Sequence, residues 1–180
     1  KGKPSSFGSA REKALIDKEK KENPDRTVIA LDAGDAFQGL PASNQSKGQD
    51  MAKAMNEIGY KAMAAGNHEF DFGLDTVEKY KNNPQNGGWL NFPILSTNVY
   101  KDGKRLFEPS TIINENGVKI GIVGVTTPET ATKTNPTGIK GVTFTKPIPE
   151  VTKEITKIKD KVDFIAVLAH LGDDTTTLED

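Results

Sequence analysis

Four short apolar runs, separated by stretches of helical periodicity, set the strongest limit on how this chain of 180 residues can fold. Runs of this length are typical of strands that are buried on both faces, and amphipathic helices between such strands cover the faces of a sheet. The sequence therefore predicts a layered α/β fold. The runs are TVIALDA (27–33), FPILST (92–97), VKIGIVGVT (118–126) and VDFIAVLAH (162–170).

Weaker signals complete the predicted strand pattern. Residues 60–64 are a further strand candidate, and residues 82–89 (NNPQNGGW) have the composition of a loop. YKDGKR (100–105) and ENGVK (115–119) place Asp-Gly and Asn-Gly pairs between extended segments. Such pairs are typical of two-residue hairpin turns, which join antiparallel strands. We therefore expect a mixed sheet.

Four stretches have the periodicity and start signals of helices. Two of them begin with a Ser that is followed three residues later by Glu or Gln, which is the spacing of a capping box. A Gly is expected to end the second. The predicted helices run from Ser9 to before Pro24, from Ser46 to Gly59, over residues 73–82, and from behind Pro149 with Val151, Ile155, Ile158 and Val162 on one apolar face.

Composition excludes several classes of function. The chain has 24 basic and 25 acidic residues, a net charge of -1, so no basic surface for a nucleic-acid polymer is expected. No run of about 18 apolar residues is present, which excludes a transmembrane segment. The absence of cysteine excludes disulfides, thiolate catalysis and Cys-ligated zinc. GIVGVTTPE (121–129) lacks the glycine spacing of a dinucleotide-binding turn, which argues against an oxidoreductase.

Polar residues follow three of the predicted strands. Asp35 comes shortly after the first run, Asn67 and His68 follow residues 60–64, and His170 ends the last run. The carboxyl ends of strands in an open α/β sheet converge on one crevice. A carboxylate, an amide oxygen and an imidazole suit Mn²⁺, Zn²⁺ or Fe²⁺. Each residue also has a structural interpretation, as a turn residue for Asp35 and Asn67 and as a hydrogen-bonded core histidine for His170.

His68 has an acidic neighbour three residues further on, Asp71. An Asp that hydrogen-bonds one ring nitrogen fixes the tautomer of a histidine and raises its basicity, as a proton donor or electrostatic clamp requires. The alternative is a helix N-terminus with Asp71 as its cap. Glu69 is expected to serve local structure.

The chain resembles a known family through five segments: LDAGDAFQG (31–39), AAGNHEFDFG (64–73), NFPILSTNVY (91–100), GIVGVTTPET (121–130) and VLAHLG (167–172). Their order and spacing are similar to those of the calcineurin-like metallophosphoesterases, in the branch of bacterial 5′-nucleotidases and 2′,3′-cyclic-nucleotide phosphodiesterases. The resemblance extends from Phe7 to Gly172. It implies a layered α-β-β-α fold with a mixed sheet.

The resemblance also implies roles for the five candidate residues. Asp35 would bridge two divalent ions, Asn67 and His170 would be ligands of one of them, and His68, with Asp71 as its partner, would contact the phosphate in the transition state. The implied reaction releases phosphate from nucleoside 5′-monophosphates by attack of hydroxide at a binuclear metal centre. Alternatives are a 2′,3′-cyclic-nucleotide phosphodiesterase or 3′-nucleotidase, a nucleotide-sugar hydrolase, or a catalytically silent surface module for binding or adhesion.

The chain departs from the family pattern at both ends. Family members carry an Asp-x-His motif before the position of Lys1, and a Gly-His-x-His motif and a nucleoside-binding domain after Asp180. We therefore expect residues 1–180 to be a partial metallophosphoesterase domain whose sheet lacks its first strand.

Two expectations follow from this departure. In the isolated 180 residues Asp35 would be the only ligand of one ion, so we expect at most one weakly bound ion and little or no hydrolysis. An exposed sheet edge would permit a strand-exchanged oligomer. The family resemblance implies a location outside the cell or on the cell wall.

Overall fold

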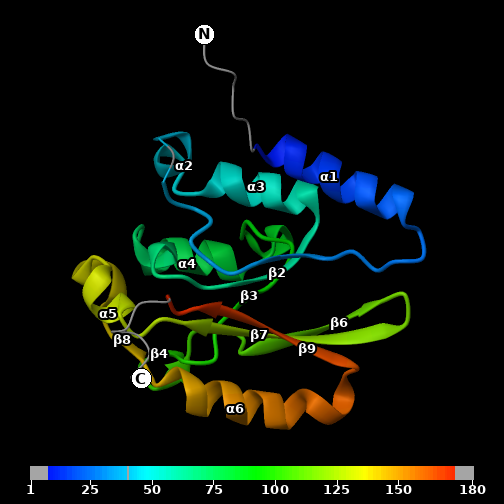
Figure 1. The fold of residues 1–180 in the computed structure, drawn as a ribbon. Coiled ribbons are helices and arrows are strands. Elements are labelled where there is room, and N and C mark those ends of the chain that lie inside the picture. The colour runs from blue at the N-terminus through cyan, green and yellow to red at the C-terminus, as the bar shows by residue number, and fades with distance from the viewer. Residues whose placement is uncertain (1–7, 40, 173–180) are drawn as a thin grey trace.

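A computed structural model describes residues 8–39 and 41–172 of the chain. Helices lie on the two outer sides and strands lie between them, so the layers follow the order α-β-β-α (Figure 1). Helices α1 (Ser9–Glu22) and α3 (Gln49–Ile58) cover one side, and α6 (Pro147–Ile158) covers the other. The layered α/β prediction is confirmed. None of the helices in the described part of the chain is long and apolar enough to cross a membrane.

Within residues 8–39 and 41–172 the strands form three small sheets. The first is parallel and has the order β1-β2-β3, and the second is antiparallel. The third is mixed, because β7 pairs antiparallel with β6 and parallel with β9. The strands are β1 (Ala30–Asp32), β2 (Tyr60–Ala64) and β3 (Ile94–Leu95); β4 (Val99–Lys101), β5 (Lys104–Arg105) and β8 (Val142–Phe144); and β6 (Ser110–Glu115), β7 (Val118–Thr126) and β9 (Phe164–His170).

Both predicted hairpins are present. Asp102 and Gly103 have φ angles of 50° and 78°, and Asn116 and Gly117 have φ angles of 55° and 85°. Two successive residues in the left-handed region are the mark of the type I′ turn, whose twist matches that of paired strands. These turns connect β4 to β5 and β6 to β7.

The helix predictions are right in position but wrong in their start signals. Gly8 is the N-cap of α1, so Ser9 already lies in the first turn, and no side chain among the described residues caps this helix. Gly48 is the N-cap of α3, and the Ser46 hydroxyl accepts a 3.4 Å hydrogen bond from the Asp50 amide. Gly59 ends α3 in the left-handed region, as predicted.

The third and fourth predicted helices also shift at their ends. Helix α4 (Leu74–Lys81) corresponds to residues 73–82. Helix α6 begins at Pro147, before the predicted start behind Pro149, and proline is tolerated there because it has no N–H to lose in a first turn. Val162 lies beyond α6 and a following 3₁₀ turn. The remaining short helices are α2 (Pro41–Gln45), α5 (Thr130–Lys133), and the 3₁₀ helices η1 (His68–Phe70), η2 (Pro84–Asn86), η3 (Pro136–Ile139) and η4 (Lys159–Lys161).

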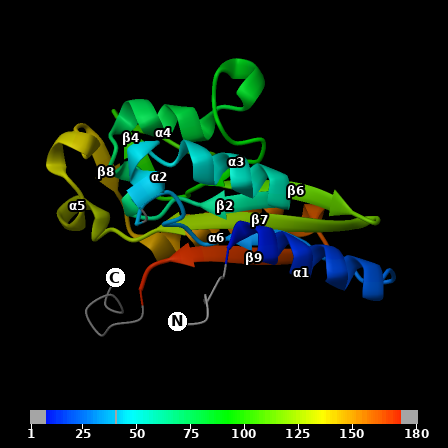
Figure 2. The same cartoon turned by 90° about the horizontal axis from the view of Figure 1, so that it is seen from above.

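Two apolar clusters hold the layers together. The larger contains the stacked rings of Phe37 and Tyr80, whose centroids are 4.1 Å apart, and includes Met55 of α3. The smaller lies between the first and third sheets and includes Ala62, Leu95 and Ile122. Strands β2, β7 and β9 run in the same general direction when the molecule is seen from above (Figure 2).

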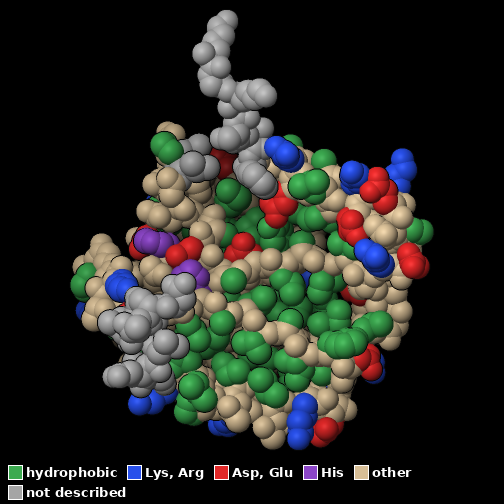
Figure 3. Space-filling model, in the orientation of Figure 1, with side chains coloured by type: hydrophobic (Ala, Val, Ile, Leu, Met, Phe, Trp, Pro, Cys, Tyr) green, Lys and Arg blue, Asp and Glu red, His purple; other side chains and the backbone are tan. Residues whose placement is uncertain are grey.

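Strands β1 and β9 are edge strands within the described residues, since each pairs with a single neighbour. Phe164 of β9 is 66% exposed and Val167 is 42% exposed. Figure 3 shows apolar side chains gathered over the part of the molecule where β9 and β7 run. An exposed edge with apolar side chains can pair with another strand.

Candidate functional site

The first part of the candidate site is the turn that follows β1. Gly34 and Asp35 have φ angles of 105° and 66°, and the Gly34 amide donates to the Asp32 carboxylate over 2.8 Å. A β-carbon on Gly34 would lie 2.7 Å from the Gly66 nitrogen, so glycine permits this loop to approach the loop after β2. A left-handed Asp is unusual, and such conformations are concentrated at functional positions.

The second part is the turn that follows β2, where Asn67 and His68 lead into η1. Because β1 and β2 are parallel neighbours, their carboxyl ends lie side by side. The Asp35 Oδ1 atom accepts a hydrogen bond of 2.9 Å from the His68 backbone amide. The two turns are therefore joined directly although they lie more than thirty residues apart in the sequence.

His170 comes to these two turns from β9, in the other strand layer. Its Nε2 atom lies 3.1 Å from Asp35 Oδ2 and 3.1 Å from Asn67 Oδ1. Its Nδ1 atom lies 3.0 Å from the Ala33 carbonyl oxygen, which is a position for Nδ1–H to donate. The structure thus brings together all three residues that the sequence predicts as metal ligands. In Figure 3 both histidines and acidic side chains gather at the end of the molecule where β9 ends.

This arrangement fits a divalent cation. A proton on Nε2 can be donated to either of the two facing oxygens. A cation in place of that proton would have one carboxylate oxygen, one amide oxygen and one imidazole nitrogen as ligands. The Nδ1 contact with a backbone carbonyl is the usual outer support of a metal-binding histidine. Within the described ranges no group of three or more His, Asp or Glu residues is placed to hold a metal ion, and the set described here has two such residues and the Asn67 amide.

His68 is paired with Asp71, as the sequence predicts. The His68 Nδ1 atom lies 2.6 Å from Asp71 Oδ2, and 40% of the His68 side chain remains exposed. This hydrogen bond is the main reason that the pKa of His68 is raised. The alternative of Asp71 as a helix N-cap is wrong, because Gly73 occupies that position before α4.

The charged groups of the site shift the pKa values of one another. Burial alone would raise the pKa of Asp35, but hydrogen bonds from His170 and from the His68 amide, with the charge of both imidazoles, hold it below its ordinary value. The hydrogen bond with Asp35 in turn raises the pKa of His170. Each group thus favours the charged form of the other.

Glu69 is a site residue that the sequence analysis did not identify. Its side chain is fully buried, and burial raises its pKa to about 7 although three backbone amides donate to it. The amides belong to Gly66, Asp35 and Ala36. Its role therefore extends beyond the local structure expected for it. Partners of this kind are backbone groups, which leave no pattern of side chains in the sequence.

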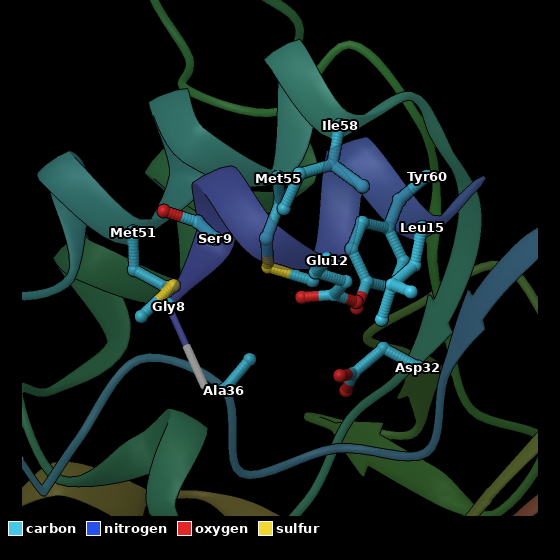
Figure 4. Close-up of a pocket in the computed structure, with 10 residues that line it drawn as sticks. All are labelled: Gly8, Ser9, Glu12, Leu15, Asp32, Ala36, Met51, Met55, Ile58 and Tyr60. Carbon is cyan, nitrogen blue, oxygen red and sulfur yellow. The ribbon is translucent and has the colours of Figure 1, made fainter. Parts of the chain in front are cut away.

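A groove lies beside the Asp35 loop, between α1 and α3 (Figure 4). The Tyr60 hydroxyl donates to the Glu12 carboxylate there, and burial raises the pKa of Asp32. None of the metal-ligand candidates lines this groove, so it is distinct from the candidate site. Its lining is Gly8, Ser9, Glu12, Leu15, Asp32, Ala36, Met51, Met55, Ile58 and Tyr60.

Relatives of this chain include proteins named 5′-nucleotidase and proteins named UshA. The chain is 41% identical over 172 residues to the 5′-nucleotidase of Vibrio cholerae, an alignment that covers 92% of the chain and 30% of that protein. It is 34% identical to protein UshA of Escherichia coli, again over 92% of the chain and 30% of the relative. The chain thus spans less than a third of the length of these relatives.

Solved structures share the fold. The 5′-nucleotidase precursor of Thermus thermophilus superposes with a TM-score of 0.70 at 34% identity, over 89% of the chain and 31% of that structure. The calcineurin-like phosphoesterase YfkN of Bacillus subtilis superposes with a TM-score of 0.80 at 28% identity, over 96% of the chain and 56% of that structure. Residues 7–178 match the family described as calcineurin-like phosphoesterase, and the chain therefore belongs to that family.

Proposed function

We propose that residues 1–180 are a partial metallophosphoesterase domain of a metal-dependent phosphohydrolase that releases phosphate from nucleoside 5′-monophosphates. The observation that carries this proposal is the position of His170 Nε2, 3.1 Å from both the Asp35 carboxylate and the Asn67 amide oxygen. Relatives named 5′-nucleotidase, at 41% identity in Vibrio cholerae, support the substrate class. The layered fold and the family match agree with a phosphoesterase.

The five residues divide into two groups. Asp35, Asn67 and His170 would hold divalent ions such as Mn²⁺ or Zn²⁺, with Asp35 shared between two ions. Such ions lower the pKa of water and neutralise charge on phosphoryl oxygens. The hydrogen bond to Asp71 raises the pKa of His68 and so favours the protonated form, which would donate a hydrogen bond to a phosphoryl oxygen and stabilise the charge that develops there.

The isolated 180 residues should bind at most one ion, weakly, and hydrolyse little. The three convergent donor atoms suffice for one incomplete coordination sphere, and a second ion would keep only Asp35 among the described residues. One shared carboxylate does not offset the repulsion between two divalent ions. The complete protein would bind two ions. We further propose that the complete protein acts outside the cell. The edges of β1 and β9 would permit a strand-exchanged oligomer of the 180 residues, which light scattering would detect.

The test uses the protein as its gene encodes it. Phosphate release from AMP in the presence of Mn²⁺ should be observed, and Asp35→Asn should abolish it. A panel with 2′,3′-cyclic AMP and UDP-glucose separates 5′-nucleotidase activity from the cyclic phosphodiesterase and nucleotide-sugar alternatives. If Mn²⁺, Zn²⁺ and Fe²⁺ all fail to support hydrolysis of any of these substrates, the surface-module alternative replaces the enzyme. Metal analysis of the isolated 180 residues after dialysis tests the limit of one ion.

A further inference from the structure

One buried carboxylate receives hydrogen bonds from both turns of the candidate site. Oε2 of Glu69 accepts from the amides of Asp35 at 2.8 Å and Gly66 at 2.6 Å. Its Oε1 atom accepts from the amide of Ala36 at 2.9 Å. Asp35 and Ala36 belong to the turn after β1, whereas Gly66 belongs to the turn after β2. A single side chain thus links the two turns.

The turn after β1 needs such support. The φ angle of Asp35 is 66°, a region that residues other than glycine seldom occupy unless the surroundings hold them there. Two successive amides, those of Asp35 and Ala36, point at the same carboxylate. Successive amides arranged in this way form a concavity that favours an anion. By accepting from both amides, the Glu69 side chain stabilises the backbone conformation that presents the Asp35 side chain.

We propose that Glu69 is a positioning residue for the metal site. This inference rests on the proposed function. Both carboxylate oxygens of Glu69 are engaged by backbone amides and the side chain is fully buried, so Glu69 acts through the backbone rather than as a ligand. It holds the two turns together so that the side-chain oxygens of Asp35 and Asn67 face His170 Nε2 before any ion binds.

The substitution Glu69→Gln tests this role because it changes the hydrogen-bonding groups of the side chain and keeps the shape of the side chain. Glutamine has one acceptor oxygen and one NH₂ donor, whereas all three partners of Glu69 are donors. If the oxygen takes the place of Oε2, the NH₂ group must face the Ala36 N–H. The variant thus keeps the buried volume but breaks at least one of the three hydrogen bonds. The matched control is Glu57→Gln on the exposed face of α3.

The experiment measures binding of Mn²⁺ by calorimetric titration of the complete protein without substrate. Loss of an outer-shell partner typically weakens metal binding about 10- to 100-fold, so we expect the Kd of Glu69→Gln to rise by at least about 10-fold and that of Glu57→Gln to stay unchanged. A Kd within about 3-fold of wild type in a folded Glu69→Gln protein would overturn the proposal. A lower unfolding temperature with an unchanged Kd would also overturn it, because Glu69 would then serve only stability.

Hydrogen exchange of the folded proteins supplies a second readout that does not depend on metal binding. In the metal-free wild-type protein, the amides in peptides covering residues 33–38 and 65–69 should be protected, and Glu69→Gln should expose them. Unprotected amides in the wild type would refute the link between the turns. If the wild type binds no Mn²⁺ or Zn²⁺, the proposed function fails. The exchange rates then decide by themselves whether Glu69 joins the turns.

Discussion

Replacement of Asn98 by alanine should remove a large part of the stability of this fold. The Asn98 side chain is 0% exposed and its amide joins three segments. Its Nδ2 atom donates to the carbonyls of Thr126 at 2.8 Å and Thr145 at 3.0 Å. Its Oδ1 atom accepts from the Thr126 amide at 3.0 Å and from the Ser96 hydroxyl at 3.1 Å. Asn98 thus ties the start of β4 to the end of β7 and to the residue after β8.

The magnitude follows from the backbone groups that lose this partner. They are one N–H and two C=O groups, and a buried polar group without a partner costs about 1–3 kcal/mol. The carbonyls lie at the lower end of that range, since each has a second lone pair. We therefore expect Asn98→Ala to lower the free energy of unfolding by about 3–6 kcal/mol, a large share of the roughly 5–15 kcal/mol of a typical domain.

Urea unfolding measures this loss. The single tryptophan, Trp89, makes an edge contact with Tyr80 at a centroid distance of 5.6 Å, so its fluorescence reports on the core. Asn91→Ala removes an exposed amide and should change the free energy of unfolding by less than about 0.5 kcal/mol. Asn98→Asp keeps the shape but turns an oxygen toward two carbonyls, so it should be at least as damaging. A loss below about 1 kcal/mol for Asn98→Ala would refute the reasoning.

Three further predictions concern the candidate site. Gly34→Ala should destabilise the protein by about 1–3 kcal/mol, since the new β-carbon would lie 2.7 Å from the Gly66 nitrogen at a φ of 105°; an unchanged midpoint in urea would contradict this. Asp71→Asn should lower the pKa of His68 toward its ordinary value in an NMR titration with EDTA present, since the hydrogen bond to Asp71 is the main cause of the raised pKa. The contribution of His68 to the free energy of unfolding is fully present below the unfolded pKa and is lost as the pH rises through the raised folded pKa. An identical titration curve for the variant would count against the pairing of His68 with Asp71. Removal of divalent ions by dialysis should lower the melting temperature of the complete protein, because an ion that binds only the folded state stabilises it. Asp35→Asn should abolish that difference, and equal melting temperatures with and without Mn²⁺ in the wild type would speak against a metal site.

The longer helices and most strands could be predicted from the sequence because their signals are local, whereas α2, α5 and β8 were not predicted. The apolar run at 118–126 coincides with β7, and residues 60–64 coincide with β2. The Asp-Gly and Asn-Gly pairs form the predicted turns, since few residues tolerate two left-handed positions in a row. Helix starts were less predictable. At Ser9 a glycine one position earlier takes the extended conformation that a capping residue needs.

Part of the candidate site could also be predicted. Asp35, Asn67 and His170 were recognisable as polar residues at strand ends, and the parallel pairing of β1 with β2 places the ends that carry Asp35 and Asn67 together. The pairing of His68 with Asp71 was predictable because the two residues lie three positions apart. These relationships are short in sequence or follow from the rules of sheet topology.

Only the tertiary structure decided which buried side chains join the loops and strands of this fold. Glu69 and Asn98 bond mainly to backbone amides and carbonyls of residues about 30 to 50 positions away. Every residue carries the same backbone groups, so a sequence contains no pattern that marks which of them a buried side chain will meet. The chain by itself determined which chemical groups are available at the strand ends. Folding decided that His170, on a different sheet from Asp35 and Asn67, comes within 3.1 Å of both.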